Sequence, residues 1–135
     1  MAEKQANLGI ILSELYEIPT LKGKNTIQFS FATKLLHTID NNKPIYDQNL
    51  AGIIKRWRQG FNKDEKISSC IEIYNYLEKL YLNMLQDTRI TGIISKFRLK
   101  FKDSKDISDT KILDFIMWSY GDLIKNIEKI KKDES

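Results

Sequence analysis

The chain has 135 residues, of which 41% are hydrophobic and 30% are charged, and its formal net charge is +4 at pH 7. This balance excludes an intrinsically disordered chain, which would hold fewer apolar side chains for its charge. A chain of this length supports one hydrophobic core. With only six Gly and two Pro, we expect a single domain over residues 1–135, built from long elements joined by short turns.

Three features of the sequence bear on where the protein works. Cys70 is the only cysteine, so no internal disulfide can form, which favours a reducing, cytoplasmic setting. Residues 1–7 lack the charged-then-apolar layout of a signal peptide. No apolar run approaches the roughly 18 residues that a membrane span requires. We therefore expect a soluble cytoplasmic protein that does not act at a membrane.

Apolar residues recur every three or four positions along most of the chain, which predicts amphipathic helices. No segment alternates apolar and polar residues with a period of two, and no internal repeat is present, so we predict an all-α fold of six helices without a sheet. The expected helices span residues 3–17, 29–39, 47–59, 64–86, 88–101 and 108–130, and residues 131–135 are expected to fray. The helix over 64–86 is long enough to form the central column.

Cap and breaker residues set the boundaries of these helices. Pro19 disfavours helical geometry in the residue before it and ends the first helix. Pro44 fixes an extended entry to the third helix, and Asp47 is suited to cap its free amides. Trp57 is expected on the buried face of that helix. Residues 87–88 are a credible cap for the fifth helix.

Positive charge is concentrated in two parts of the chain. Residues 1–62 hold eight Lys or Arg against five Asp or Glu, and residues 89–105 hold six against a single Asp. Such clusters attract phosphates, although a solvated lysine face is the equally simple alternative. The candidate nucleic-acid contacts are Lys34, Lys55, Arg56, Arg58, Lys96, Arg98 and Lys100.

Several common catalytic sites are excluded by residue types. Zinc ligation needs three or four His, Cys or carboxylate ligands, and His37 and Cys70 are the only residues of the first two kinds. Cys70 lies on the predicted buried stripe of its helix, where a thiol is usually inert. Residues 21–26 contain one Gly and follow no strand, so they do not form a phosphate-binding loop. We predict no metal and no cofactor.

The order of elements around residues 31–56 resembles the catalytic segment of helix-hairpin-helix DNA glycosylases. Residues 31–37 (Phe-Ala-Thr-Lys-Leu-Leu-His) lead to a Pro-containing loop at residues 44–47 (Pro-Ile-Tyr-Asp), and residues 50–56 begin the next helix. The resemblance implies that Asp47 stands where the essential carboxylate of that family stands. There a carboxylate stabilises positive charge on the sugar and orients the attacking water.

A base that leaves the helical stack also needs a pocket to receive it. The side chains available for this are His37, Tyr46, Trp57 and Trp118. The chain further resembles uncharacterised bacterial proteins that share the Phe-Ala-x-Lys-x-Leu-His and Pro-Ile-Tyr-Asp patterns and a late Asp-Phe-Ile-x-Trp element, here residues 114–118. The Gly-rich hairpin with which the glycosylases bind the DNA backbone is absent from residues 25–30.

Each candidate has a structural alternative. Asp47 directly before a helix is a cap worth about 1 kcal/mol, and His37 is satisfied by a neighbouring carbonyl group. Tyr46, Trp57 and Trp118 are core aromatics in this interpretation. The basic residues then form a solvated face and pair with nearby acids.

The leading hypothesis is a small nucleic-acid-associated protein of bacterial or phage type, which acts on DNA bases or only binds DNA, with Asp47 as its one candidate catalytic residue. The alternative is a non-enzymatic interaction module, such as an adaptor or inhibitor, whose basic surface docks onto an acidic protein. A DNA-binding regulator that uses the helix over 47–59 is a third possibility. The oligomeric state stays open.

Overall fold

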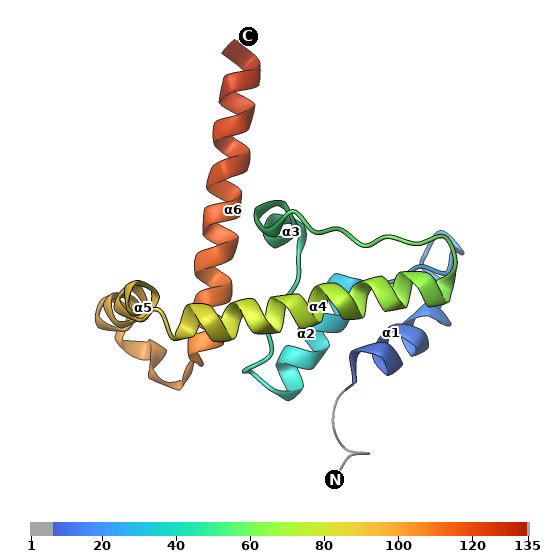
Figure 1. Cartoon of the computed structure of the whole chain (residues 1–135), viewed down its shortest axis with the longest axis horizontal. Helices are drawn as coiled ribbons and strands as arrows, with labels where there is room; N and C mark the ends of the chain where they lie inside the picture. Colours follow the sequence, from blue (N-terminus) through green and yellow to red (C-terminus); the bar gives the residue numbers. More distant parts are fainter. Residues whose placement is uncertain (1–6, 135) are drawn as a thin grey trace.

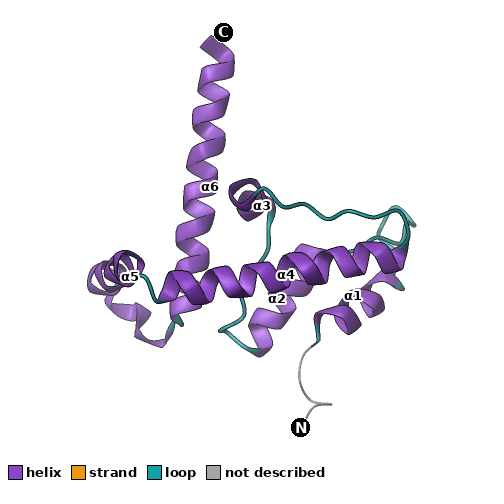
Figure 2. Ribbon diagram, viewed as in Figure 1, coloured by secondary structure: helices purple, strands orange, loops and turns teal. Residues whose placement is uncertain are grey.

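The computed structural model describes residues 7–134, and this part of the chain consists of helices and loops without a strand (Figures 1 and 2). The elements are α1 (Leu8–Tyr16), α2 (Phe29–Ile39), α3 (Gln48–Ile54), α4 (Lys63–Leu85), α5 (Thr88–Lys100), a 3₁₀ helix (Lys102–Asp106) and α6 (Asp109–Glu134). The predicted all-α fold of six α-helices is confirmed. The expected start of the first helix, over residues 3–6, lies outside the described residues, as does residue 135.

Four helices begin at a polar residue that caps their free amides. Asn7 Oδ1 accepts from the amide of Ile10, and Asn62 Oδ1 accepts from the amide of Glu65. Asp87 caps α5 in the same way, and Asp47 caps α3. The predicted caps at positions 47 and 87 are therefore confirmed, and each accepts a hydrogen bond from an amide that would otherwise lack a partner.

The long helix α4 is the central column of the fold, as its length predicts. In Figure 1 it runs across the molecule, with α1 against one half and α5 and the start of α6 at its other end, and α2 packs against α1. Its residues Cys70 and Leu77 are fully buried with Leu12, Leu36 and Leu113 from three other helices. Burial raises the pKa of the Cys70 thiol to about 12, so this cysteine is inert.

The loop between α2 and α3 is held in place by hydrogen bonds from three helices. The Tyr74 hydroxyl of α4 donates to the carbonyl oxygen of Pro44 at 2.8 Å. On the α2 side, the amide of Tyr46 donates to Thr33 Oγ1 at 3.0 Å. On the α6 side, the amide of Ile45 donates to a carboxylate oxygen of Asp114 at 3.2 Å. The position of Asp47, directly after this loop, is thereby fixed relative to all three helices.

Helix α3 ends earlier than the sequence pattern predicts. Lys55 adopts the left-handed conformation (φ 58°) and its amide donates to Ala51, which closes the helix at Ile54. Residues 55–62 then run as a loop toward the start of α4 (Figure 2). The predicted helix over 47–59 is thus wrong beyond residue 54. Trp57 is 55% exposed, so its predicted place in the core is wrong as well.

Helix α6 has two different halves. Its first half packs against α3, α4 and α5, and its second half extends away from the other helices (Figure 1). A Cβ built on Gly121 would lie 2.9 Å from the backbone oxygen of Asn49, so α3 and α6 approach here more closely than any larger residue allows. The predicted fraying of the tail is wrong for residues 131–134, which continue the helix.

No helix within residues 7–134 combines the length and the apolar character needed to cross a bilayer.

Candidate functional site

A cleft of about 260 Å³ lies where the α2–α3 loop meets α4 and α6. Three of the residues that the sequence pattern predicts for the site, Lys34, Asp47 and Trp118, line this one cleft although they come from α2, from the start of α3 and from α6. The other polar residues that line it are Tyr81, Lys111 and Asp114. The fold therefore brings together three predicted residues that lie up to 84 positions apart in the sequence.

Asp47 is both a helix cap and part of the cleft wall. Its Oδ1 accepts a hydrogen bond from the amide of Leu50 at 2.8 Å, and its side chain is half-buried at the edge of the cleft. A carboxylate has acceptor capacity for about four hydrogen bonds. The capping bond uses one of these positions, so the cap and a role in the cleft are compatible.

Asp114 is the carboxyl group of the cleft that is held most tightly. Its Oδ1 accepts from the Tyr81 hydroxyl at 2.6 Å and from the amide of Ile45 at 3.2 Å. Its Oδ2 is buried and has no hydrogen-bond partner among the described residues. Burial raises the pKa of Asp114 to about 6, against the opposing effects of the two hydrogen bonds and of the electrostatic interactions with His37 and Lys111.

A carboxyl group with this pKa exchanges a proton close to neutral pH, which is the property of a general acid or base. Sequence reasoning did not select Asp114 as a site residue. The signal was present, because this Asp interrupts the apolar run of residues 112–117. An acidic residue on the buried side of a helix needs partners or a function.

Tyr81 is hydrogen-bonded to Asp114 and lies within electrostatic range of Asp47. Its hydroxyl donates to Asp114, and its pKa is raised first by burial, then by the charge and the hydrogen bond of Asp114, and also by the charge of Asp47. Both carboxylates are thus within electrostatic range of this hydroxyl. The raised pKa keeps Tyr81 protonated, so it remains a donor toward the cleft wall at all physiological pH values.

The rim of the cleft is aromatic and basic. Trp118 is 47% exposed and Phe115 is 56% exposed, so both rings have free surface, while Lys34 and Lys111 are exposed lysines. An aromatic surface stacks planar groups, carboxylates accept hydrogen bonds from N–H groups, and lysines attract anions. The cleft therefore suits a planar molecule that carries N–H donors and an anionic group.

Three of the four predicted pocket residues lie outside this cleft: Trp57 lines a separate hollow, and His37 and Tyr46 hold the loop. His37 Nδ1 lies 2.8 Å from the carbonyl oxygen of Lys43 and helps to hold the loop. Tyr46 is buried, stacks on Phe29 with ring centroids 4.1 Å apart and donates from its hydroxyl to the carbonyl oxygen of Arg56. Both therefore follow the structural alternative described above for them.

Apart from Lys34, which lines the cleft, the predicted basic residues are divided between two regions. Lys55 and Arg56 line a hollow of about 250 Å³ beside Ser69 of α4, and the Arg56 guanidinium lies 3.8 Å from the centre of the Tyr76 ring. The basic residues of α5 follow the other end of α4. The 16 residues between Ser69 and Leu85 span about 24 Å of helix, so the two groups do not form one continuous basic groove.

Within these regions the basic residues differ in how far they are engaged. Arg98 donates to the carbonyl oxygens of Ser104 and Ile107 at 2.8 and 2.9 Å and forms an ion pair with Asp109. It therefore stabilises the connection between α5 and α6. The remaining predicted contacts, Arg58, Lys96 and Lys100, have exposed side chains.

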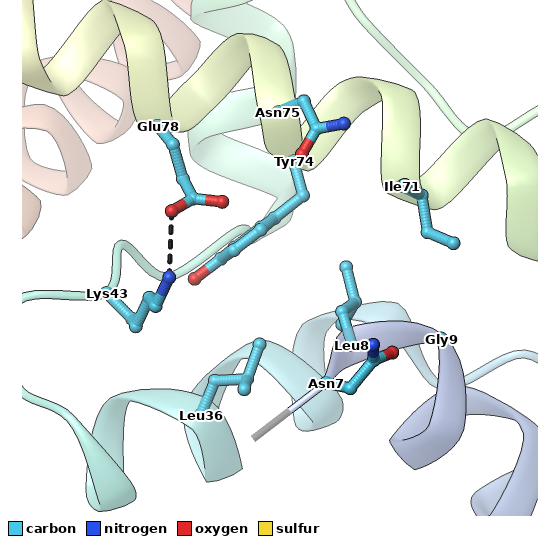
Figure 3. A pocket seen from close by; sticks show the side chains of 9 residues that line it. All are labelled: Asn7, Leu8, Gly9, Leu36, Lys43, Ile71, Tyr74, Asn75 and Glu78. Carbon is cyan, nitrogen blue, oxygen red and sulfur yellow. Dashed lines mark hydrogen bonds and ion pairs between the residues drawn. The ribbon is translucent and has the colours of Figure 1, made fainter. Parts of the chain in front are cut away.

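A second cavity, of about 220 Å³, lies between α1, α2 and α4 (Figure 3). Its charged groups, Lys43 and Glu78, form an ion pair at 3.0 Å, which Figure 3 shows beside the Tyr74 ring. None of the predicted site residues lines it. Its two charged groups therefore already neutralise each other.

Residues 7–134 contain no cluster of three His, Cys, Asp or Glu side chains placed to hold a metal ion. The chain matches no family model, no curated protein and no solved structure. The resemblance to helix-hairpin-helix glycosylases stays a prediction.

Proposed function

We propose that the protein binds nucleic acid and receives an unpaired base in the cleft between α2, α3 and α6. The observation that carries this proposal is the convergence of Lys34, Asp47 and Trp118 on one cleft, together with a second carboxyl group at Asp114. The cleft, at about 260 Å³, is slightly smaller than the pockets of about 300 Å³ or more that hold drug-sized ligands. This size favours a single base or nucleoside over a larger molecule.

Each chemical feature of a nucleotide has a counterpart in the cleft. The base stacks on the exposed face of Trp118, an interaction worth about 1–3 kcal/mol per base. The carboxylate of Asp47 accepts from the N–H groups on the edge of the base, as acidic residues do from the amino group of cytosine. Lys34 and Lys111 contact the phosphates on either side and position the strand.

The same geometry suits removal of the base by hydrolysis. Cleavage of the N-glycosidic bond develops positive charge on the sugar, which Asp47 stabilises while water attacks the anomeric carbon. The departing base takes up a proton from solvent. The oxygen of the attacking water becomes bonded to the sugar, and one proton of this water passes to solvent, so charge and atoms balance.

Binding is tested with fluorescently labelled single-stranded and duplex DNA at two salt concentrations. We expect preference for the single strand and a fall in affinity of roughly tenfold for Trp118→Ala, because one stacked base is lost. Trp57→Ala is the matched control, since Trp57 is exposed to a similar extent, at 55%, but lies outside the cleft. Equal losses for the two variants, or no binding at low salt, would contradict a base-binding cleft.

Catalysis is tested separately by base release from single-stranded DNA. Asp47→Asn keeps an oxygen that can cap α3 and removes the negative charge, so we expect loss of turnover with the fold retained. Retention of DNA binding without turnover in the native protein would reduce the proposal to binding alone.

The exposed loop over residues 55–61 supports a second candidate function, the non-enzymatic interaction module. Lys55, Arg56 and Arg58 stand there in one segment with the exposed rings of Trp57 and Phe61. Arg and Trp are enriched at the centres of protein interfaces, and this loop would dock onto an acidic protein. The two tryptophan variants distinguish the proposals, because a docking loop depends on Trp57 and not on Trp118.

A further inference from the structure

The second half of α6 carries an apolar stripe that no other described element covers. This part of the helix stands away from the rest of the molecule (Figure 1). Tyr120 is 54% exposed, Leu123 55%, Ile127 43% and Ile130 58%. Single exposed apolar side chains scattered over a surface are normal in soluble proteins, whereas a contiguous exposed apolar patch is unusual. The patch on this projecting helix therefore marks an interaction surface.

The spacing of the stripe is that of a coiled-coil seam. Ile116, Tyr120, Leu123, Ile127 and Ile130 follow one another at intervals of four, three, four and three residues. This alternation is the heptad pattern in which two helices pack side chains into each other's gaps. At about 100° per residue the five side chains fall within an arc of about 80°. They form one narrow face.

Charged residues keep to the other faces of this segment. Asp122, Lys125 and Lys129 project from the side opposite the stripe, and no charge interrupts the stripe between residues 116 and 130. A narrow seam of this kind pairs best with an identical seam, because both then present the same repeat and the same width.

We propose that the stripe pairs with the same stripe of a second copy of this chain in an antiparallel coiled coil. In the antiparallel register Leu123 faces Ile127 of the second copy and Tyr120 faces Ile130, and Ile116 lies outside the paired part of the stripe. The flanking residues Ile124 and Asn126 each meet their own counterpart at the two-fold axis, which places apolar against apolar and amide against amide. The outer flank pairs are Met117 with Lys131 and Ser119 with Asp133.

No like charges meet in this arrangement, and the helix dipoles of the two copies oppose each other favourably. A parallel pair would instead place Ile124 against Ser119 and would lose the apolar contact at the axis. Together the two stripes would bury on the order of 1,000 Å², the lower limit of a specific interface. The first half of α6 is already packed in the fold, and the second half continues the same helix. Pairing therefore costs little conformational entropy.

The oligomeric state of the full chain in solution tests this inference. We expect sedimentation equilibrium to show a monomer–dimer equilibrium in the micromolar range. Leu123→Glu should weaken the dimer by at least tenfold with an unchanged helical circular dichroism spectrum. Lys125→Glu is the matched control, because it introduces the same residue two positions away on the polar face, and it should leave the dimer intact. A monomeric native protein, or equal effects of the two variants, would overturn the inference.

The orientation has its own test. Asn126→Cys should be bridged readily between copies by a short bis-maleimide in the antiparallel pair, whereas Ile127→Cys would be bridged in a parallel one, and Cys70 is fully buried. Dominant bridging through position 127 would overturn the antiparallel arrangement. If the protein were monomeric and sedimented with vesicles of phosphatidylcholine and phosphatidylglycerol, the stripe would bind a lipid surface. That result would likewise overturn the proposed pairing of two copies. The outcome does not depend on the proposed role of the cleft.

Discussion

The two halves of α6 carry one continuous apolar stripe in opposite surroundings. In the first half Leu113 is fully buried and Asp114 contributes a carboxyl group to the cleft. In the second half Leu123 is 55% exposed, so no other described helix covers it. An apolar stripe along a helix therefore identifies a face that needs a partner. For the first half of α6 the partner is the rest of the chain, and for the second half, as we propose, it is a second copy.

The largest expected effect compares the same substitution in the two halves. Leu113→Ala should lower the free energy of unfolding by about 3 kcal/mol, because it removes buried apolar atoms and leaves a cavity. Leu123→Ala should change it by less than about 0.5 kcal/mol in the monomer, since the side chain is already largely in contact with water. Urea denaturation at low protein concentration measures both values. Similar losses at the two positions would show that the second half is packed against the body.

The two halves of α6 also differ in how an aspartate affects the pH dependence of stability. The pKa of Asp114 is raised from 3.8 to about 6, so the folded state binds the proton more tightly than the unfolded state does. Its contribution to stability is present below about pH 4 and is lost as the pH rises toward and through 6. Asp114→Asn should therefore raise the free energy of unfolding at pH 8 by about 2 kcal/mol and have little effect near pH 4.

Asp122→Asn is the control for this prediction, because it removes the same charge from the exposed face of the second half. Urea denaturation of both variants at the two pH values gives the difference directly. A gain at pH 8 from Asp122→Asn, or none from Asp114→Asn, would show that burial of the Asp114 charge does not control the pH dependence.

Periodicity and caps predicted most of the fold. The helix class, the number of helices and the caps at Asp47 and Asp87 all follow from local chemistry, which acts over a few residues. The end of α3 does not. Residues 55–59 have no helix breaker before Gly60, and the helix stops because the chain must cross to the start of α4, which is a tertiary requirement that Lys55 meets in a left-handed conformation.

The cleft was predictable in part. The pattern around residues 44–47 led to Asp47, and the late element at 114–118 led to Trp118, but their proximity depends on the close packing of α3 on α6. Asp114 was missed because its importance lies in burial and in the hydrogen bond from Tyr81, neither of which a linear sequence displays. His37 and Tyr46 lie close to Asp47 along the chain, but their side chains hold the loop and line no part of the cleft.

The smallest expected effect concerns Gly121, at the boundary between the two halves. An added Cβ would lie 2.9 Å from both Cβ and backbone oxygen of Asn49, so Gly121→Ala must push α3 away from α6. Overpacking of this kind costs about 1–3 kcal/mol, and the better helix propensity of Ala returns up to about 1 kcal/mol, which leaves a net loss of about 1 kcal/mol.

Gly92→Ala supplies the opposite sign for comparison. Gly92 lies in α5, and a Cβ added there would meet open space, so the substitution should stabilise the protein by about 0.5–1 kcal/mol through helix propensity alone. Thermal denaturation measures the two variants side by side. If Gly121→Ala stabilised the protein as Gly92→Ala does, α3 and α6 would be free to separate. The cleft, whose wall includes residues from both helices, could then open without cost. A loss at Gly121 alone would mean that this contact holds Asp47 and Trp118 at a fixed separation, as a preformed binding site requires.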